Sequence, residues 1–247
     1  PGVQIPQRPP PMELSCQNHW GCSEKGMSRG RNVSNNLDDD ALNTLREVMI
    51  QEQIIDRGVA SERTIAAMRV VPRHVFLPQQ MWSNAYDDRP HPIGHGQTIS
   101  QPYIVSLMTS QLDSLPIGCR ILEIGSGCGY QTAILVEMGF EVHSIEIVPE
   151  LAQRSKQILE ELSLLPASIT NGDGRLGLPE IAPFSGILAA ACGEEIPETW
   201  LKQQATPGII VAPVEGKRNQ HLIRIDNTES DGAIQRVICP VRFVKLH

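Results

Sequence analysis

The sequence has no long hydrophobic run and no excess of positive charge. No stretch approaches the roughly 18 apolar residues of a membrane-spanning helix, and the N-terminus lacks the basic-then-apolar pattern of a secretory signal. These absences predict a soluble, cytoplasmic protein. The 21 Lys and Arg residues stand against 28 Asp and Glu residues, which gives a net charge of −7. Since a negative chain is poorly suited to bind a phosphate backbone, we expect neither a membrane nor a nucleic acid as partner.

Paired cysteines are also missing. The sequence contains no Cys-x-x-Cys pair and no His/Cys spacing that suits zinc, although it has six cysteines, Cys16, Cys22, Cys119, Cys128, Cys192 and Cys239. Isolated cysteines in apolar segments are usually small buried side chains. We therefore expect reduced thiols, no disulfide and no structural metal.

The chain has enough apolar residues for one folded domain. Hydrophobic residues make up 40% and charged residues 20% of its 247 residues, which argues against disorder throughout. Residues 1–36 differ from the rest, because they hold five prolines and no apolar periodicity. We predict a disordered extension over residues 1–36 and a single domain over residues 37–247.

The first part of this domain, residues 37–112, has the pattern of helices joined by loops. Acidic residues at 38–40 precede apolar positions at helical spacing, and a second short helix is expected over residues 61–69. Prolines and glycines predict mostly loop over residues 72–100. Ser100 then precedes Gln101 and Pro102 at the start of a further helix, where the serine is expected to be the N-cap.

From residue 113 onward, short apolar strands alternate with helices. Strands are expected at residues 120–124, 142–145, 168–170, 187–190 and 209–214, with helices at 130–138, 149–162 and 197–204. Strands separated by helices pair in parallel with right-handed crossovers, which predicts a doubly wound α/β sheet. Two final strand-like segments, residues 222–225 and 237–244, have no helix between them and predict an antiparallel hairpin at the sheet edge.

Three strand ends carry residues typical of a cofactor site. A glycine-rich turn, EIGSGCG, follows the first of these strands at residues 123–129, Glu146 ends the next, and Asn171-Gly172-Asp173-Gly174 follows the third. Ligands bind at the carboxyl ends of strands in open α/β sheets. The dinucleotide fingerprint needs a glycine at position 130, where this chain has Tyr130, so an NAD-dependent dehydrogenase is disfavoured. The pattern suits a nucleoside without a pyrophosphate, and we infer S-adenosylmethionine.

Several segments resemble the protein-L-isoaspartate O-methyltransferase family from about residue 40 onward. The most specific is PIGHGQTISQP at residues 92–102, joined by Val71-Pro72-Arg73, Arg89-Pro90, the 123–129 turn, residues 172–174 and PVRFV at residues 240–244. The resemblance implies a Rossmann-like methyltransferase fold. It also implies methyl transfer from S-adenosylmethionine to the free carboxylate of L-isoaspartyl residues, which initiates repair of damaged proteins and peptides.

The resemblance further implies roles for individual residues. Ser100 matches the active-site serine, Ile99, Ser100 and Gln220 match positions on the substrate side, and no metal is expected. The expected cofactor contacts are Thr98, Ile99, Glu123, Gly125, Gly127, Gly129, Glu146, Gly172 and Asp173. We expect a monomer. Two alternatives stay open: an aspartyl O-methyltransferase that acts on a dedicated peptide, and a catalytically inactive regulatory protein that binds S-adenosylmethionine.

Overall fold

The computed structural model describes residues 38–230 and 232–247. The predicted extension at residues 1–36 lies outside the described residues. The described residues belong to one compact unit. Its larger sheet has seven strands in the order β5-β4-β3-β6-β7-β8-β9. The strands are β3 (Arg120–Ile124), β4 (Glu141–Glu146), β5 (Ser168–Asn171), β6 (Phe184–Ala189), β7 (Gln204–Glu215), β8 (Gln220–Thr228) and β9 (Gly232–Val241).

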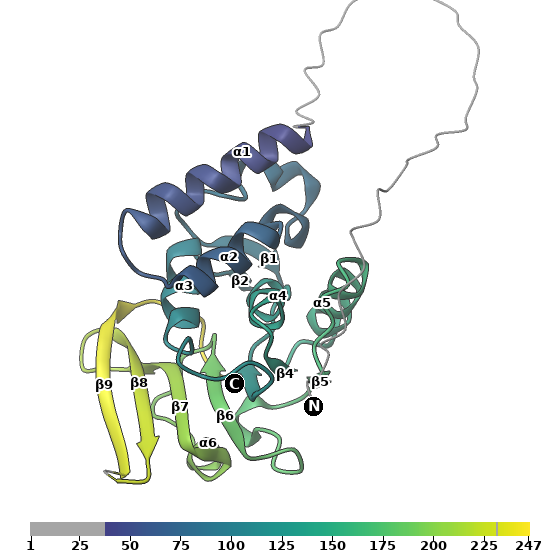
Figure 1. Cartoon of the computed structure of the whole chain (residues 1–247). Helices are drawn as coiled ribbons and strands as arrows, with labels where there is room; N and C mark the ends of the chain where they lie inside the picture. Colours follow the sequence, from purple (N-terminus) through teal and green to yellow (C-terminus); the bar gives the residue numbers. More distant parts are fainter. Residues whose placement is uncertain (1–37, 231) are drawn as a thin grey trace, which may run out of the picture. The chain divides into compact units, whose positions relative to one another are not determined.

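The sheet is parallel over five strands and antiparallel at one edge. Strands β5, β4, β3, β6 and β7 are parallel neighbours, whereas β8 pairs antiparallel with both β7 and β9. The edge formed by β8 and β9 is seen on the left of Figure 1. The predicted doubly wound, mostly parallel sheet with an antiparallel C-terminal hairpin is therefore confirmed.

Helices lie on both faces of this sheet and before it in the chain. They are α1 (Asp39–Met49), the π-helical turn η1 (Ile50–Ile55), α2 (Glu62–Val70), the 3-10 turns η2 (Arg73–Phe76) and η3 (Gln79–Asn84), α3 (Pro102–Ser110), α4 (Tyr130–Glu137), α5 (Pro149–Glu161), the 3-10 turn η4 (Gly174–Leu176) and α6 (Glu198–Gln203). Helix α1 begins as its sequence predicts, because the Asp38 carboxylate accepts a hydrogen bond from the Ala41 N–H at 2.8 Å.

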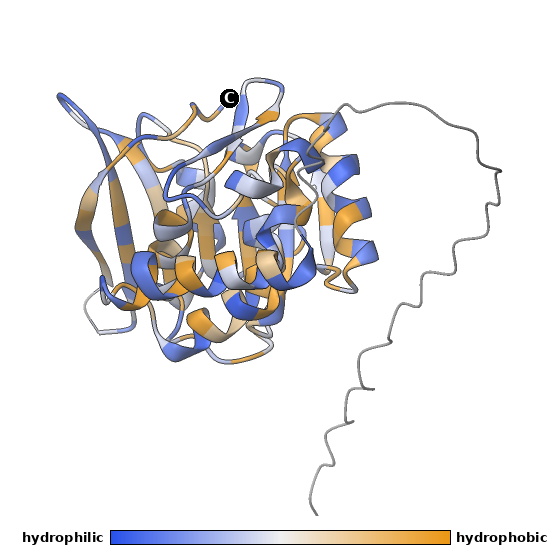
Figure 2. Cartoon of the chain, turned by 90° about the horizontal axis from the view of Figure 1, so that it is seen from above, coloured by the Kyte–Doolittle hydropathy of each residue, from blue (hydrophilic) through white to orange (hydrophobic). Residues whose placement is uncertain are grey.

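The alternation of strand residues divides the interior into two cores. Ile121 and Leu188 point into the larger core with the N-terminal helices, α4 and α5, whereas their neighbours Leu122 and Ile187 point into a smaller core with Trp200 of α6. Successive strand side chains alternate between faces, so each apolar strand fills both cores. Figure 2 shows the apolar strands at the centre and polar residues along the outer sides of the helices.

The prediction of loop over residues 72–100 is wrong at its end. Strands β1 (His91–Gly94) and β2 (Gln97–Ile99) form an antiparallel hairpin, in which His91 lies opposite Ile99. Pro92 is tolerated because this ribbon has only two strands. The turn uses positive φ at Gly94, His95 and Gly96, so the glycines close a hairpin there rather than interrupt regular structure.

The predicted N-cap of α3 is also wrong. The helix begins at Pro102, so the capping position falls on Gln101, which makes no side-chain capping bond. A proline at the first helical position has no N–H to be capped. Ser100 lies one residue before the cap, and its carbonyl oxygen accepts a hydrogen bond from Arg73 Nη2 at 2.7 Å.

Candidate active site

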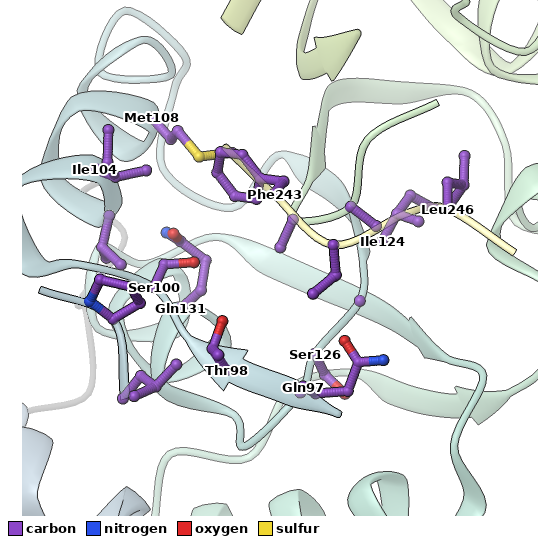
Figure 3. Close-up of a pocket in the computed structure, with 18 of the residues that line it drawn as sticks. Gln97, Thr98, Ser100, Ile104, Met108, Ile124, Ser126, Gln131, Phe243 and Leu246 are labelled. Atoms are coloured by element: carbon purple, nitrogen blue, oxygen red, sulfur yellow. The ribbon is translucent and has the colours of Figure 1, made fainter. Parts of the chain in front are cut away.

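A cavity of about 340 Å³ opens at the carboxyl ends of β3, β4 and β6. One wall comes from the strand ends and the glycine-rich turn, and another from β2 with the first turns of α3. Residues 240–247 line a third side. Figure 3 shows side chains from all three regions, with Ser126, Ser100 and Phe243 among those labelled. The cavity lies in the volume range of small-molecule sites, about 300–1,000 Å³.

Main-chain hydrogen bonds hold the glycine-rich turn against the sheet. Gly125 N donates to Ile145 O at 2.8 Å, and Gly129 N donates to Ser126 O at 2.8 Å. Gly127 has a φ of +53° and Gly129 a φ of +94°, a region that strains residues with a side chain. At Gly129, a Cβ atom would also lie 3.1 Å from the Ser155 Cβ. Glycines thus allow the turn to lie close to a ligand on one side and to α5 on the other.

Glu146 brings a buried carboxylate to this cavity. Glu146 is 4% exposed and lines the strand-end wall of the cavity. The Oε2 atom accepts from Gly127 N at 2.7 Å and Oε1 accepts from Val148 N at 3.0 Å. Because each carboxylate oxygen has a further lone pair, the fixed side chain can still accept two hydroxyl hydrogens. This is the arrangement that a ribose needs.

Ser126 adds a buried hydroxyl without a partner. It is 4% exposed, lines the cavity, and its Oγ makes no hydrogen bond to any described residue. A buried polar atom normally has a partner, so one without a partner at a cavity wall points to a ligand. The turn, Glu146 and this hydroxyl together fit a nucleoside cofactor of the S-adenosylmethionine type.

Thr98, Ile99 and Ser100 line the opposite side of the same cavity. The roles expected for them, Thr98 and Ile99 at the cofactor and Ile99 and Ser100 at the substrate, stay predictions. The Ser100 carbonyl is held by Arg73, and the Ser100 hydroxyl makes no hydrogen bond to a described residue. Figure 3 labels both Ser100 and Gln131 among the residues that line the cavity. A hydroxyl with a fixed main chain and no competing partner is suited to contact an incoming carboxylate.

Sequence reasoning missed several lining residues. Gln131 in the first turn of α4 lines the cavity, and its Nε2 donates to Thr109 Oγ1 at 2.5 Å. Ile104 and Met108 of α3 also line the cavity, as do Phe243 and Leu246, which no local pattern indicates. The PVRFV motif at residues 240–244 was the one signal that could have drawn attention to this last segment.

Gln220 is not in the cavity wall but holds a residue that is. Its Oε1 accepts from Phe243 N at 2.5 Å and its Nε2 donates to Phe243 O at 3.3 Å. Residues 240–247, which include Phe243, are also bound to the loop after β6. There Cys192 N donates to Val244 O and Leu246 N donates to Cys192 O, both at 2.8 Å. Gln220 therefore positions the Phe243 main chain, and direct contact with substrate stays a prediction.

Glu123 lies beneath the glycine-rich turn and does not line the cavity. It is fully buried, and its Oε2 accepts from Thr132 Oγ1 at 2.6 Å and from Ser144 Oγ at 2.8 Å. Burial raises the pKa of this carboxyl from 4.5 to about 7, against the opposing effect of the two hydroxyls. Its expected contact with a cofactor stays a prediction, and its observed contacts join α4 to β4.

Gly129, Gly172 and Asp173 also lie outside the cavity wall, while Gly174 beside them lines it. Gly172 N donates to Glu146 O at 3.0 Å, so this loop supports the end of β4. The Asp173 carboxylate accepts from Arg175 N at 2.9 Å and pairs with the Arg175 guanidinium, which lowers the pKa of Asp173. Gly125, Gly127 and Glu146 are thus the predicted cofactor residues that the strand ends bring to the cavity.

The described residues contain no obvious metal site. Within 38–230 and 232–247, no three His, Cys, Asp or Glu side chains come together in a way that could hold a metal ion. No helix in these ranges is long and apolar enough to cross a membrane. The described cysteines, Cys119, Cys128, Cys192 and Cys239, are free thiols.

Known proteins are similar to this chain in sequence and in fold. Residues 44–247 match the family model described as protein-L-isoaspartate(D-aspartate) O-methyltransferase. Protein-L-isoaspartate O-methyltransferases from Gloeobacter violaceus and Opitutus terrae are 44% and 45% identical over 198 and 199 residues, covering 80% and 81% of this chain and 96% and 85% of theirs.

A solved structure agrees with these relatives. The crystal structure of a putative protein-L-isoaspartate O-methyltransferase from Plasmodium falciparum, in complex with S-adenosyl-L-homocysteine, superposes with a TM-score of 0.71 at 26% identity, over 83% of this chain and 97% of that one. The family model, the sequence relatives and this solved structure all agree. The chain therefore belongs to the protein-L-isoaspartate(D-aspartate) O-methyltransferase family.

Proposed function

We propose that this protein is a repair enzyme that transfers a methyl group from S-adenosylmethionine to the free carboxylate of L-isoaspartyl residues in damaged proteins and peptides. One observation carries the proposal: the strand-end wall with Glu146 and the wall with Ser100 belong to the same cavity. A methyl donor and a carboxylate acceptor bound to these walls meet inside it. Membership of the family and its named relatives support the same reaction.

The reaction requires positioning rather than acid–base catalysis. When bound, S-adenosylmethionine supplies an electrophilic methyl group on a positively charged sulfur. A carboxyl group with a pKa of about 4 is already ionised at neutral pH, so the protein needs no general base. Its task is to hold one carboxylate oxygen in line with the methyl group and to exclude water, and well-oriented groups gain several kcal/mol from such placement.

Each wall has its own part in this placement. Glu146 accepts hydrogen bonds from the ribose, and the 125–127 turn lets the cofactor approach the main chain. Ser100 donates its hydroxyl hydrogen to the acceptor carboxylate, while Thr98 and Ile99 form the floor of the cleft. The apolar side chains Ile104, Met108 and Phe243 limit access of water to the same space.

The experiment that tests this proposal uses two synthetic peptides that differ only in one L-isoaspartyl or L-aspartyl residue. Labelled methyl transfer from S-adenosylmethionine is measured for each. Preference for the isoaspartyl peptide is the expected result. Preference for the aspartyl peptide would favour a dedicated-peptide methyltransferase, and cofactor binding without turnover on either peptide would favour a regulatory protein.

We also propose that the enzyme acts in the cytoplasm as a monomer. The free thiols of the described cysteines suit a reducing compartment. Cell fractionation tests the location, and light scattering after gel filtration tests the monomeric state.

A further inference from the structure

Arg73 is a fully buried cation behind the acceptor side of the cavity. It begins the 3-10 turn η2 and is 0% exposed, the only Lys or Arg in the described part of the chain that is buried to this degree. An arginine stays protonated in proteins, so it carries its charge inside. Burying a cation without a counter-ion is costly in free energy, so a buried arginine of this kind calls for a reason beyond packing.

The guanidinium makes three contacts, two of them with residues that line the cavity. Its Nη2 donates to Ser100 O at 2.7 Å and its Nε donates to Ala85 O at 2.8 Å. Its Cζ lies 4.8 Å from the centroid of the Tyr130 ring, at the first residue of α4. Ser100 and Tyr130 both line the cavity, whereas Arg73 does not. One side chain therefore lies directly behind two lining residues.

No anion among the described residues neutralises this charge. No acidic side chain forms an ion pair with Arg73, and its Nη1 has no hydrogen-bond partner in the described part of the structure. Neither Tyr130 nor Cys128 supplies a negative charge near neutral pH, because burial raises the pKa of Tyr130 to about 12 and raises that of Cys128. The positive field of Arg73 is thus left to act on the neighbouring cavity, in a protein whose net charge is −7.

We propose that Arg73 is a positioning residue for the methyl acceptor, which fixes the Ser100 main chain and attracts the acceptor carboxylate to this side of the cavity. The proposal rests on the proposed function, because it needs an anionic acceptor. The attraction is strong here because a charge behind a protein wall is screened less than one in solvent. The same field opposes the positively charged sulfur of S-adenosylmethionine but not the neutral sulfur of S-adenosylhomocysteine.

The chain offers a matched control in Arg63. Its guanidinium also donates to main-chain carbonyls, at 2.6 Å to Met138 O and 2.9 Å to Leu115 O. Its Cζ also lies over an aromatic ring, 4.3 Å from the centroid of Phe140. None of these residues lines the cavity. Replacing Arg63 therefore removes equivalent contacts without removing charge next to the site.

The test compares Arg73→Met and Arg73→Lys with Arg63→Met. Calorimetry gives the dissociation constants of S-adenosylmethionine and S-adenosylhomocysteine, and initial rates give KM and kcat for an isoaspartyl peptide. For Arg73→Met we expect a KM about tenfold higher and a ratio of the two dissociation constants shifted at least about threefold in favour of S-adenosylmethionine. Arg73→Lys keeps the positive charge, so the ratio of the two dissociation constants measured for this variant should equal that of the wild type.

The control and the second neutral variant make the result decisive. Arg63→Met should lower the melting temperature and leave both KM and the ligand ratio unchanged. Where Arg73→Met does not fold, Arg73→Gln replaces it, since its amide can still donate to one of the two carbonyls. An unchanged ligand ratio in a folded neutral variant, or an equal rise in KM for Arg63→Met, would overturn the proposal. If the wild type methylates no isoaspartyl peptide, the proposed function fails, whereas the ligand ratio still reports on the Arg73 field.

Discussion

The two sides of the cavity are built by different means. Most of the strand-end side comes from residues 124–147, which are close together in sequence, with Gly174 and Ala190 beside them. The main-chain N–H groups of Gly125 and Gly127 fix it by donating to Ile145 O and to the Glu146 carboxylate. The acceptor side joins residues 97–108 to residues 240–247, which are distant in sequence. Two side chains hold it in place, Arg73 at the Ser100 carbonyl and Gln220 at Phe243, together with main-chain bonds from Cys192 to residues 244 and 246.

This difference corresponds to what each side has to bind. A cofactor has one shape, and a turn of fixed main chain suits it. Isoaspartyl residues occur in many sequence contexts and share only a short carboxylate-bearing stem, so the acceptor side needs one reliable polar contact among apolar side chains. The following predictions test whether the two sides are as separate as their construction indicates.

The largest expected effect concerns Glu123 beneath the strand-end side. Its folded pKa of about 7 lies above its ordinary value of 4.5, so the native state binds the proton more tightly than the unfolded state. Its contribution to stability is therefore greatest at low pH and is lost as the pH rises from about 4.5 to 7. The difference amounts to about 2–3 kcal/mol between pH 5 and pH 8.

Urea denaturation of the wild type and Glu123→Gln over this pH range measures the effect. Gln cannot titrate but can accept the Thr132 and Ser144 hydrogens through one oxygen. The free energy of unfolding of the variant relative to the wild type should therefore rise between pH 5 and pH 8. A constant difference would show that Glu123 titrates with an ordinary pKa.

The next effect is loss of cofactor affinity in Glu146→Ala. Without the carboxylate, two ribose hydroxyls lose an acceptor and Gly127 N loses its partner. We expect S-adenosylmethionine to bind about 1–3 kcal/mol more weakly by calorimetry. If the two sides are separate, KM for the acceptor at saturating cofactor should not change. Unaltered affinity for the cofactor would remove Glu146 from the ribose site.

For Ser100→Ala we expect a small change in stability and a larger, selective loss of methyl transfer. Because Ser100 is not a helix cap, its loss should change the free energy of unfolding by less than about 0.5 kcal/mol. Methyl transfer should fall at least about tenfold, since the hydroxyl that orients the carboxylate is gone. Thermal unfolding, cofactor calorimetry and peptide kinetics separate these outcomes. A proportional loss of cofactor affinity would mean that the two sides are coupled.

No effect is expected for Glu194→Ala. Glu194 follows β6 but is exposed and does not line the cavity. An exposed charge is screened by solvent and salt. KM values for isoaspartyl peptides with acidic or basic neighbours should match those of the wild type, even at low salt. A lower KM for acidic peptides alone would place the acceptor nearer to this loop than the cavity indicates.

The contrast between the two sides also explains what the sequence could predict. Glycines after β3, Glu146 at the end of β4 and the alternation of strands with helices are local signals, and each was recognised. The hairpin at residues 91–99 was missed because prolines and glycines also signal loops. Gln131 and Phe243 reach the cavity through tertiary packing, which no local pattern encodes. Ser100 was found only through the resemblance of residues 92–102, and its local reading as an N-cap was wrong.

The contacts of residues 240–247 have a consequence for protein synthesis. Ribosomes add about 5–20 residues per second, in sequence order. The glycine-rich turn and Glu146 are made well before Gln220 can meet Phe243. A growing chain therefore contains the cofactor residues and Ser100 for several seconds while residues 240–247, the other part of its acceptor side, are still missing. The acceptor side is thus the last part of the cavity to be completed, when residues 240–247 reach Gln220 and Cys192.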